Sequence, residues 1–208
     1  MTTRLLLARH GETVWHAGNR YAGGRSEPEL TDLGLRQADQ LAKAAVALGV
    51  TVVVSSPQRR AVTTATPAAE ALGVPLHLRP DLREADFGDL EGHFLDELDP
   101  VAVQRFRDDP EANAFPNAEP LADVGARGAA ALRAIDDEHA GGTEHAAGTV
   151  LVVAHSTLFR LTLCVLLGLP VRHYRRVFPA MANAALTEIR LPADPSHPAA
   201  LISFNRAH

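Results

Sequence analysis

Histidine and arginine residues follow three short apolar runs of this 208-residue chain, over residues 3–8, 50–55 and 148–154. Nearly continuous apolar runs of this length are typical of strands that are covered on both faces, as in a parallel sheet. Because the carboxyl ends of parallel strands form the ligand crevice of an open α/β sheet, we expect the residues after the runs to meet there. Along the chain these residues are Arg9 and His10, then Arg60, then His155 and Ser156.

A histidine held between guanidinium groups could accept a phosphoryl group. Arginine presents forked donors that match phosphate oxygens, and helix N-termini add backbone N–H groups. Transfer to an imidazole nitrogen divides one difficult displacement into two easier ones. The attacking nitrogen of His10 must be unprotonated, and the nearby cations Arg9 and Arg60 would disfavour the imidazolium form.

The leaving alkoxide of such a reaction needs a proton, and the segment over residues 82–88 offers two carboxyl groups. These are Glu84 and Asp86. Their spacing alone does not distinguish the two as the proton donor.

The elements that must position these side chains alternate between strand and helix. This order predicts an α/β sheet with helices on both faces. The predicted strands cover residues 3–8, 50–55, 148–154, 184–191 and 201–204, and the predicted helices cover about 31–48, 59–72 and 157–167. Gly49, Gly73 and Gly168 follow the predicted helices, as glycine commonly does after a helix C-terminus.

The whole chain, residues 1–208, is expected to form one domain. Residues 81–123 contain 13 acidic residues against three arginines, whereas the whole chain has a net charge of only −5. We expect a helical and loop excursion from the sheet at about 93–123, with most of its charge exposed to solvent.

The composition narrows the classes of partner. A hydrophobic content of 46% and a charged content of 22% are those of ordinary globular proteins. The negative net charge argues against nucleic acid and anionic membranes as partners. No run approaches the length of a membrane span, and a cytoplasmic location is expected. The single cysteine, Cys164, lies in an apolar run and is expected to be buried.

Four blocks in this order resemble the histidine phosphatase superfamily, the phosphoglycerate mutase-like group, in the branch related to bacterial broad-specificity phosphatases. They are Arg9-His10-Gly11-Glu12-Thr13; Ser55-Ser56-Pro57 with Arg60-Ala61 and Thr64-Ala65; Leu82-Arg83-Glu84 with Phe87-Gly88 and Glu91-Gly92; and Val153-Ala154-His155-Ser156. The resemblance implies a three-layer α/β/α sandwich with a mostly parallel central sheet. It also implies His10 as nucleophile, Glu84 as proton donor, and no metal or other cofactor. Arg9, Arg60 and His155 would complete the phosphate-binding core.

Further residues near the nucleophile are expected to bind substrate: Thr13, His16, Arg20, Gly23 and Ser156. Two of these positions depart from the family pattern. His16 stands where relatives often have Asn, and Ser156 stands where Gly is usual. An imidazole can still donate one hydrogen bond, and the backbone N–H of Ser156 is equally available.

The reaction expected from this pattern is hydrolysis of a small phosphomonoester, with phosphoglycerate mutase as the alternative. Glu84 and His155 are 71 positions apart, and mutases tend to have a longer insertion there. A mutase also needs extra basic residues over its pocket, whereas the excursion is acidic. A third possibility is a non-catalytic binding module. Family members that have lost activity should lack His10, Arg60 or His155, and this chain keeps all three. The sequence leaves the substrate and the oligomeric state open, a homodimer included.

Overall fold

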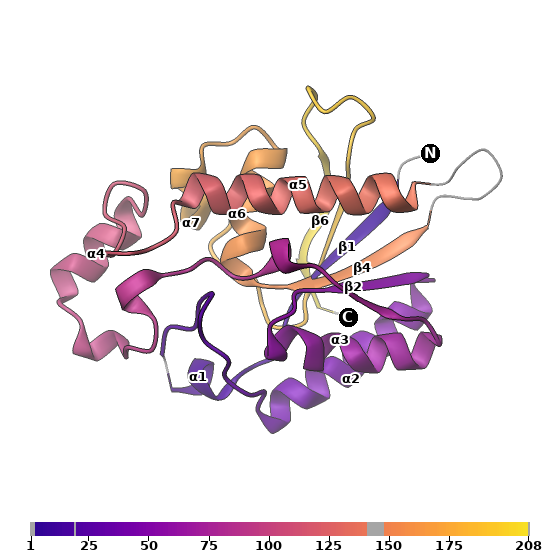
Figure 1. Ribbon diagram of the computed structural model, residues 1–208, viewed down its shortest axis with the longest axis horizontal. Coiled ribbons are helices and arrows are strands. Elements are labelled where there is room, and N and C mark those ends of the chain that lie inside the picture. Colours follow the sequence, from indigo (N-terminus) through magenta and orange to yellow (C-terminus); the bar gives the residue numbers. More distant parts are fainter. Residues whose placement is uncertain (1–2, 19, 141–147, 208) are drawn as a thin grey trace.

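The computed structural model describes residues 3–18, 20–140 and 148–207, and a six-stranded sheet runs through this part of the chain (Figure 1). The strands are β1 (Arg4–Arg9), β2 (Val52–Ser55), β3 (Leu76–Leu78), β4 (Thr149–Ala154), β5 (Leu186–Arg190) and β6 (Ala200–Arg206). Their order in the sheet is β3-β2-β4-β1-β5-β6. The first four strands in this order are mutually parallel, whereas β5 is antiparallel to both of its neighbours.

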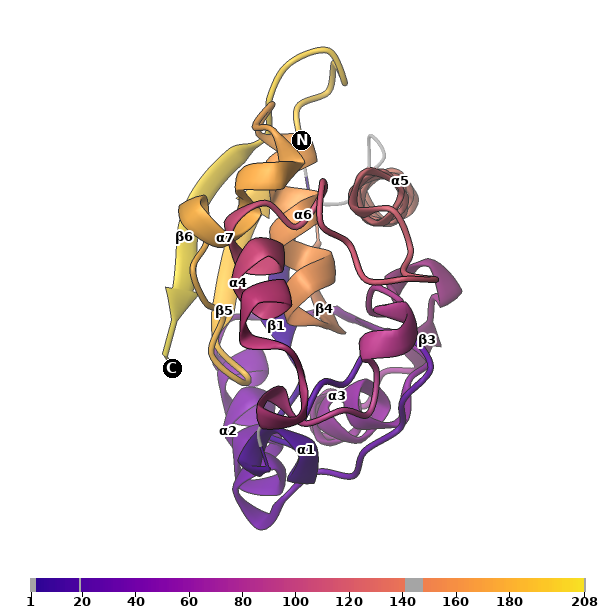
Figure 2. The ribbon, with the colours of Figure 1, turned by 90° about the vertical axis from the view of Figure 1, so that its left-hand side faces the viewer.

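Helices cover both faces of the sheet (Figures 1 and 2). On one face, α2 (Asp32–Ala47) and α3 (Arg59–Leu72) pack on Leu6, Ala8 and Val53. On the other face, α5 (Leu121–His139) and α6 (Ser156–Leu166) pack on the alternate side chains, such as Leu5 and Leu7. Successive side chains of a strand point to opposite faces, so the middle residues of β1, β2 and β4, which are covered on both faces, are all apolar. The predicted three-layer α/β/α sandwich is confirmed.

Local sequence accounts for the helix ends that were predicted. The Thr31 hydroxyl accepts a hydrogen bond from the Gly34 N–H at 3.0 Å and caps the start of α2. The α3 helix ends at Gly73, which has a φ of 67°, a conformation that costs glycine little. The strand β3 was not predicted. It has only three residues and lies at the sheet edge, with partly or fully exposed side chains.

Short elements make up much of the chain outside these layers. They are α1 (Val14–Ala17), α4 (Pro100–Asp108), α7 (Tyr174–Val177) and the 3₁₀ turns Pro80–Leu82, Gly88–Leu90, Leu95–Glu97 and Val171–His173. The α4 helix lies at one end of the molecule, at the left of Figure 1. Its Phe106 is buried and contacts Phe115 edge to face, with ring centroids 5.2 Å apart. This contact packs α4 against the loop that follows it.

The pairing register aligns the ends of the three central strands. Arg9 on β1 pairs with Ala154 on β4, and Val153 pairs with Ser55 on β2. The ladder continues past the strand ends, because the N–H of His10 donates to the Ala154 carbonyl at 2.9 Å. The residues directly after β1, β2 and β4 therefore lie along one edge of the sheet. They are His10, Ser56 and His155.

Two glycines let the loop after β1 touch the first turn of α2. A Cβ atom on Gly11 would lie 2.6 Å from the carbonyl oxygen of Gly34, and one on Gly34 would collide with the carbonyl oxygen of Glu12. Glu12 adds polar bonds to the same helix, since its N–H donates to Gln37 Oε1 at 2.8 Å and its Oε1 accepts from Thr31 Oγ1 at 2.8 Å. The loop that carries His10 is thus fixed to α2 by backbone contact.

We expect Gly34→Ala to destabilise the protein by about 1–3 kcal/mol, the usual range for overpacking. Alanine is the better helix former by roughly 0.5–1 kcal/mol, so without the backbone contact the same substitution would stabilise the protein. The free energy of unfolding in urea gives the sign directly. Arg36→Ala, at an exposed position on the same helix, is the matched control. A Gly34→Ala protein as stable as the wild type would contradict the close contact.

Candidate active site

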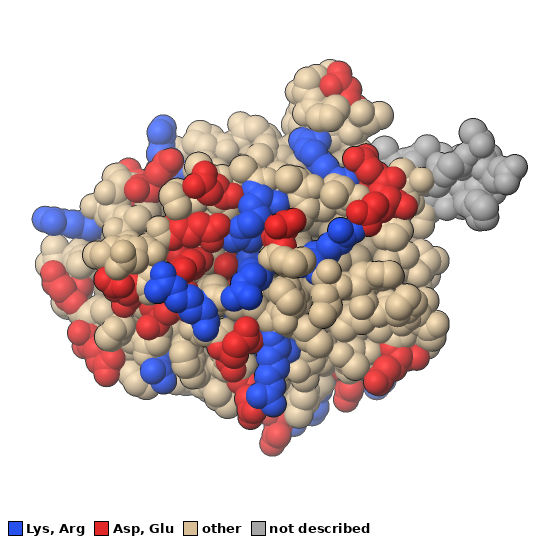
Figure 3. Space-filling model, in the orientation of Figure 1, with Lys and Arg blue, Asp and Glu red and all other residues tan. Residues whose placement is uncertain are grey.

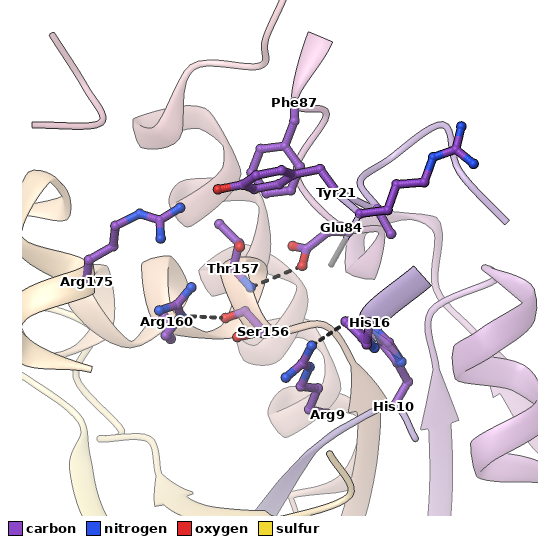
Figure 4. A pocket seen from close by; sticks show the side chains of 12 residues that line it. Arg9, His10, His16, Tyr21, Glu84, Phe87, Ser156, Thr157, Arg160 and Arg175 are labelled. Atoms are coloured by element: carbon purple, nitrogen blue, oxygen red, sulfur yellow. Dashed lines mark hydrogen bonds between the residues drawn. The ribbon is translucent and has the colours of Figure 1, made fainter. Parts of the chain in front are cut away.

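A cavity of about 250 Å³ opens at the carboxyl ends of β1 and β4 (Figure 4). Six residues predicted from the sequence line it: Arg9, His10, His16, Arg20, Glu84 and Ser156. They come from the loop after β1, from the segment around α1, from the loop after β3 and from the start of α6. Segments far apart in the chain therefore contribute to one small hollow.

His10 is held with one ring nitrogen engaged. Its Nδ1 lies 2.7 Å from the carbonyl oxygen of Gly11, and because a carbonyl can only accept, Nδ1 carries the proton. Nε2 then keeps its lone pair. The main chain around the ring is fixed by Asn183, which donates to the His10 carbonyl at 2.8 Å, and by Thr64, which accepts from the Gly11 N–H at 2.9 Å.

The surroundings keep His10 neutral. The side chain is 3% exposed, and burial lowers the pKa of His10 well below its usual value of 6.5. The positive charges of Arg60 and Arg9 lower this pKa further. Burial also lowers the pKa of Arg9, to about 10, so Arg9 stays cationic at neutral pH. The site thus combines an unprotonated imidazole nitrogen with adjacent positive charge.

His155 and Arg60 lie behind His10 rather than in the cavity wall. The His155 ring centroid is 5.2 Å from that of His10, and its Nε2 lies 2.9 Å from Ser56 Oγ. Burial, and then the charge of Arg60, lower the pKa of His155 well below its usual value. The Arg60 guanidinium donates to the carbonyl oxygens of Ser26 at 2.6 Å and Gly23 at 3.0 Å.

Three buried polar atoms of this group have no hydrogen-bond partner in the part of the chain that the structure describes. They are Arg9 Nε, Arg60 Nε and His155 Nδ1. Buried polar groups are usually satisfied, so these atoms point to a ligand or to water. Thr13 and Gly23, which were also predicted to bind substrate, do not line the cavity. Thr13 is buried and caps α1, and Gly23 supplies a carbonyl to Arg60.

His16 is stacked against His10, with ring centroids 5.4 Å apart and the ring planes at 15°. Its Nε2 lies 2.5 Å from Nη2 of Arg9, and its Nδ1 lies 3.1 Å from the hydroxyl oxygen of Thr13. Both ring nitrogens therefore face donors, because a guanidinium can only donate and the Thr13 backbone N–H also donates to Nδ1, at 3.2 Å. Burial, followed by the charges of Arg9 and Arg60, lowers the pKa of His16 to about 3.

The two candidate acids have different environments. Glu84 is 6% exposed and lines the cavity, whereas Asp86 does not line it and pairs with Arg25 at 2.7 Å. The Glu84 carboxylate accepts backbone N–H bonds from Ala85 and from the first turn of α6, at Thr157 and Leu158. Two of these bonds go to Oε1 and one to Oε2, so Oε2 has room for a further partner.

Sequence reasoning missed several residues that line the cavity. The charged ones are Arg160 and Arg175, and the aromatic ones are Tyr21 and Phe87. Arg160 is four positions after Ser156 on the same helix, and this spacing could have placed both on one face. Arg175 comes from the four-residue helix α7, and no local pattern in the sequence connects it with the site.

Arg20 reaches the cavity from a stack of aromatic rings. Its guanidinium lies 4.3 Å from the centroid of the Trp15 ring and 5.3 Å from that of Phe94, and its Nε donates to the Gly92 carbonyl. These contacts hold the side chain at the rim and link the α1 segment to the loop after residue 90.

A family model described as histidine phosphatase superfamily, branch 1, matches residues 5–200. The chain belongs to this superfamily. Among curated relatives, the Yersinia pestis protein named "Probable phosphoglycerate mutase GpmB" is 32% identical over 195 residues, which cover 92% of this chain and 86% of the relative. The predicted family is therefore confirmed.

Solved structures agree with this assignment. A mycobacterial glucosyl-3-phosphoglycerate phosphatase has a TM-score of 0.85 and 30% identity, with 100% of both chains covered. The phosphoserine phosphatase of Entamoeba histolytica, in complex with 3-phosphoglyceric acid, has a TM-score of 0.81 and 25% identity, with 99% of this chain and 98% of that chain covered. Both neighbours are phosphatases by name, the class predicted for this chain.

The lowered pKa values of His10, His16 and His155 predict that the protein loses stability in mild acid. Below pH 6.5 these histidines become protonated in the unfolded chain, whereas in the folded protein they stay neutral. The free energy of unfolding therefore falls as the pH falls. Each ring contributes up to about 1.4 kcal/mol per pH unit. His16→Asn should flatten the slope between pH 6.5 and 5 by about that amount, measured by urea unfolding.

The exposed variant His77→Asn is the matched control for this experiment, because His77 lies on the edge strand β3 away from the cavity. It should leave the slope as it is in the wild type. An unchanged slope in His16→Asn would contradict a buried, neutral imidazole at position 16.

Proposed function

We propose that this protein is a metal-independent phosphomonoesterase that transfers the phosphoryl group of a small metabolite to Nε2 of His10 and then hydrolyses the phosphohistidine. The observation that carries the proposal is the state of His10. Its Nδ1 is bonded to the Gly11 carbonyl, and its unprotonated Nε2 belongs to a buried ring beside Arg9 and Arg60. An imidazole in this state is a nucleophile, and the cations are placed to attract a phosphate.

In the first step, the lone pair of Nε2 attacks phosphorus and the bond to the ester oxygen breaks. Arg9, Arg60 and the backbone N–H of Ser156 at the start of α6 offset the charge on the three phosphoryl oxygens. Glu84 delivers a proton to the departing alkoxide, which leaves as the alcohol. The free position on Oε2 of Glu84 supports this role, because the carboxyl group can carry a proton there and keep its bonds to α6.

In the second step, water attacks phosphorus from the side that the alcohol has left. Glu84, now a carboxylate, takes one proton from the water, and the bond between nitrogen and phosphorus breaks. Inorganic phosphate leaves, and His10 returns with its proton still on Nδ1. The Gly11 carbonyl therefore stabilises the same tautomer throughout the cycle, including the phosphohistidine, whose ring is positively charged.

Solved structures with similar folds support hydrolysis over transfer, because the glucosyl-3-phosphoglycerate and phosphoserine phosphatases are hydrolases by name. The mycobacterial glucosyl-3-phosphoglycerate phosphatase also has solved structures with VO₃ and with inorganic phosphate. The Yersinia relatives carry a mutase name, which keeps phosphoglycerate mutase as the alternative. A mutase must retain its phosphohistidine while one product turns into the next acceptor.

The charges at the site support the proposed metal independence. Two guanidinium groups beside His10 would repel a cation as strongly as they attract a phosphate. In residues 3–18, 20–140 and 148–207, no group of three His, Cys, Asp or Glu side chains has a metal-binding arrangement. Full activity in EDTA is expected.

Within the same ranges, no helix has the length and apolar character needed to cross a membrane.

His10→Ala should abolish the release of phosphate from p-nitrophenyl phosphate, because it removes the proposed nucleophile. Wild-type enzyme quenched with labelled substrate should carry a label that survives alkali and is lost in acid. Both readouts should be unchanged in the control variant His77→Asn. With phosphoglycerates, the wild type should release inorganic phosphate rather than interconvert the isomers.

Three results would count against the proposal. A label that persists in His10→Ala would move the nucleophile elsewhere. A label that is stable in acid and lost in alkali would indicate an acyl phosphate. Interconversion of phosphoglycerates primed by 2,3-bisphosphoglycerate, with little release of phosphate, would favour the mutase.

Glu84→Gln should slow the hydrolysis of alkyl phosphates by about 10²–10⁴-fold, the usual contribution of general acid catalysis. It should slow p-nitrophenyl phosphate much less, because p-nitrophenolate leaves without a proton. The kcat/KM values for the two substrates give the comparison, because they report the first step and not the later attack of water, and Asp86→Asn is the control in the same loop. Equal losses on both substrates would remove Glu84 from the acid role.

A further inference from the structure

Besides Arg20 at its rim, the cavity has positive charge at two further places. Arg9 lies beside His10, whereas Arg160 and Arg175 lie across the cavity from His10 (Figure 4). Glu84 is the one acidic residue among those that line the cavity, and its carboxylate is occupied by backbone N–H groups. Among the described residues, Arg9, Arg160 and Arg175 form no ion pair with a carboxylate.

Elsewhere several arginines are matched with acids. On the face shown in Figure 3, basic and acidic side chains are interleaved. Arg127 pairs with Glu119 at 2.8 Å, and Arg25 pairs with Asp86 at 2.7 Å. The arginines of the cavity differ from these pairs because they face a hollow rather than a carboxylate. Charges that are removed from water without a partner are unfavourable, so such an arrangement points to an anionic ligand.

Arg160 is held rigidly at the floor of this second region. Its side chain is 7% exposed, and its Nη1 donates to the carbonyl oxygens of Phe178 at 3.1 Å and Pro179 at 3.2 Å. Its Nε donates to the carbonyl of Ser156 at 3.2 Å. Carbonyl oxygens orient the guanidinium without neutralising it, so the full positive charge remains available.

Arg175 is half-buried between two aromatic rings. Its guanidinium carbon lies 4.9 Å from the centroid of Phe106 and 5.2 Å from that of Tyr174. Its Nε is buried and has no hydrogen-bond partner among the described residues. In Figure 4 the hydroxyl of Tyr21 points towards the same guanidinium. The two rings pack against the guanidinium in the cavity wall, where its terminal nitrogens can serve a planar acceptor.

We propose that Arg160 and Arg175 form a second anion site that binds a carboxylate of the substrate. This inference rests on the proposed function, because the phosphate end of the substrate must lie at His10. The forked donors of arginine match the two oxygens of a carboxylate. A cavity of about 250 Å³ is smaller than typical pockets for drug-sized ligands, so it suits a small phosphorylated acid.

The test compares two substrates that differ only at this group. 3-Phosphoglycerate carries a carboxylate where glycerol 3-phosphate carries a hydroxymethyl group. Wild-type enzyme should have the higher kcat/KM for 3-phosphoglycerate. Arg175→Gln should lower the ratio of the two kcat/KM values by about 10–100-fold, the range expected for hydrogen bonds to charged groups.

Two further variants separate charge from structure. Arg176→Gln, at an exposed position beside the site, should leave both kcat/KM values as in the wild type. Arg175→Lys should keep part of the preference, because it retains the charge but loses the fork. Urea unfolding of Arg175→Gln establishes that the variant is folded before its kinetics are compared.

The outcomes distinguish this proposal from the proposed function. A wild-type preference for glycerol 3-phosphate, or an unchanged ratio in Arg175→Gln, would overturn the carboxylate site while p-nitrophenyl phosphate is still hydrolysed through His10. A larger Arg175-dependent preference for fructose 1,6-bisphosphate over fructose 6-phosphate would assign the site to a second phosphate instead. Failure to hydrolyse any phosphomonoester, with no label on His10, would overturn the function itself.

Discussion

The hydrogen bond between Nδ1 of His10 and the Gly11 carbonyl decides which ring nitrogen can react. It depends on a chain of backbone contacts that begins in the sheet, where the His10 N–H extends the ladder from β1 to β4. It continues into α2, because Gly11 and Gly34 allow the loop and the helix to touch through their main chains. The proposed nucleophile is therefore positioned by backbone, and its side chain needs no bond beyond the one to Gly11.

The same positive charges act on the free enzyme and on its ligand. Burial, together with the charges of Arg60 and Arg9, holds His10 and His155 neutral, and several buried donors nearby have no hydrogen-bond partner among the described residues. A bound phosphate would reverse the balance, since a nearby dianion favours protonated imidazoles and satisfies the guanidinium donors. Ligand binding is thus expected to relieve the repulsion between these positive charges.

The ends of the three central parallel strands could be predicted from sequence, because each strand is an apolar run that polar residues follow at once. His10 and His155 could be predicted for the same reason, since they come directly after two of these runs. The choice of Glu84 over Asp86 needed the family resemblance, and the pairing of Asp86 with Arg25 now gives it a physical reason. Arg175 could not be predicted, because only the tertiary packing of α7 brings it to the cavity. The strand β3 could not be predicted either, because an edge strand of three mostly exposed residues has no apolar run that would mark it in the sequence.

The α6 helix connects the parts of the site. Its first turn is capped by the Glu84 carboxylate, which accepts the N–H groups of Thr157 and Leu158, so the candidate acid is bonded to the helix that begins at Ser156. Arg160 lies four residues after Ser156, a rise of about 6 Å along the helix axis. One rigid element thus sets the distance between the phosphate end of the cavity and the second anion site. A separation of this size corresponds to a short carbon skeleton between two anionic groups, which is why the helix itself would select the length of the substrate.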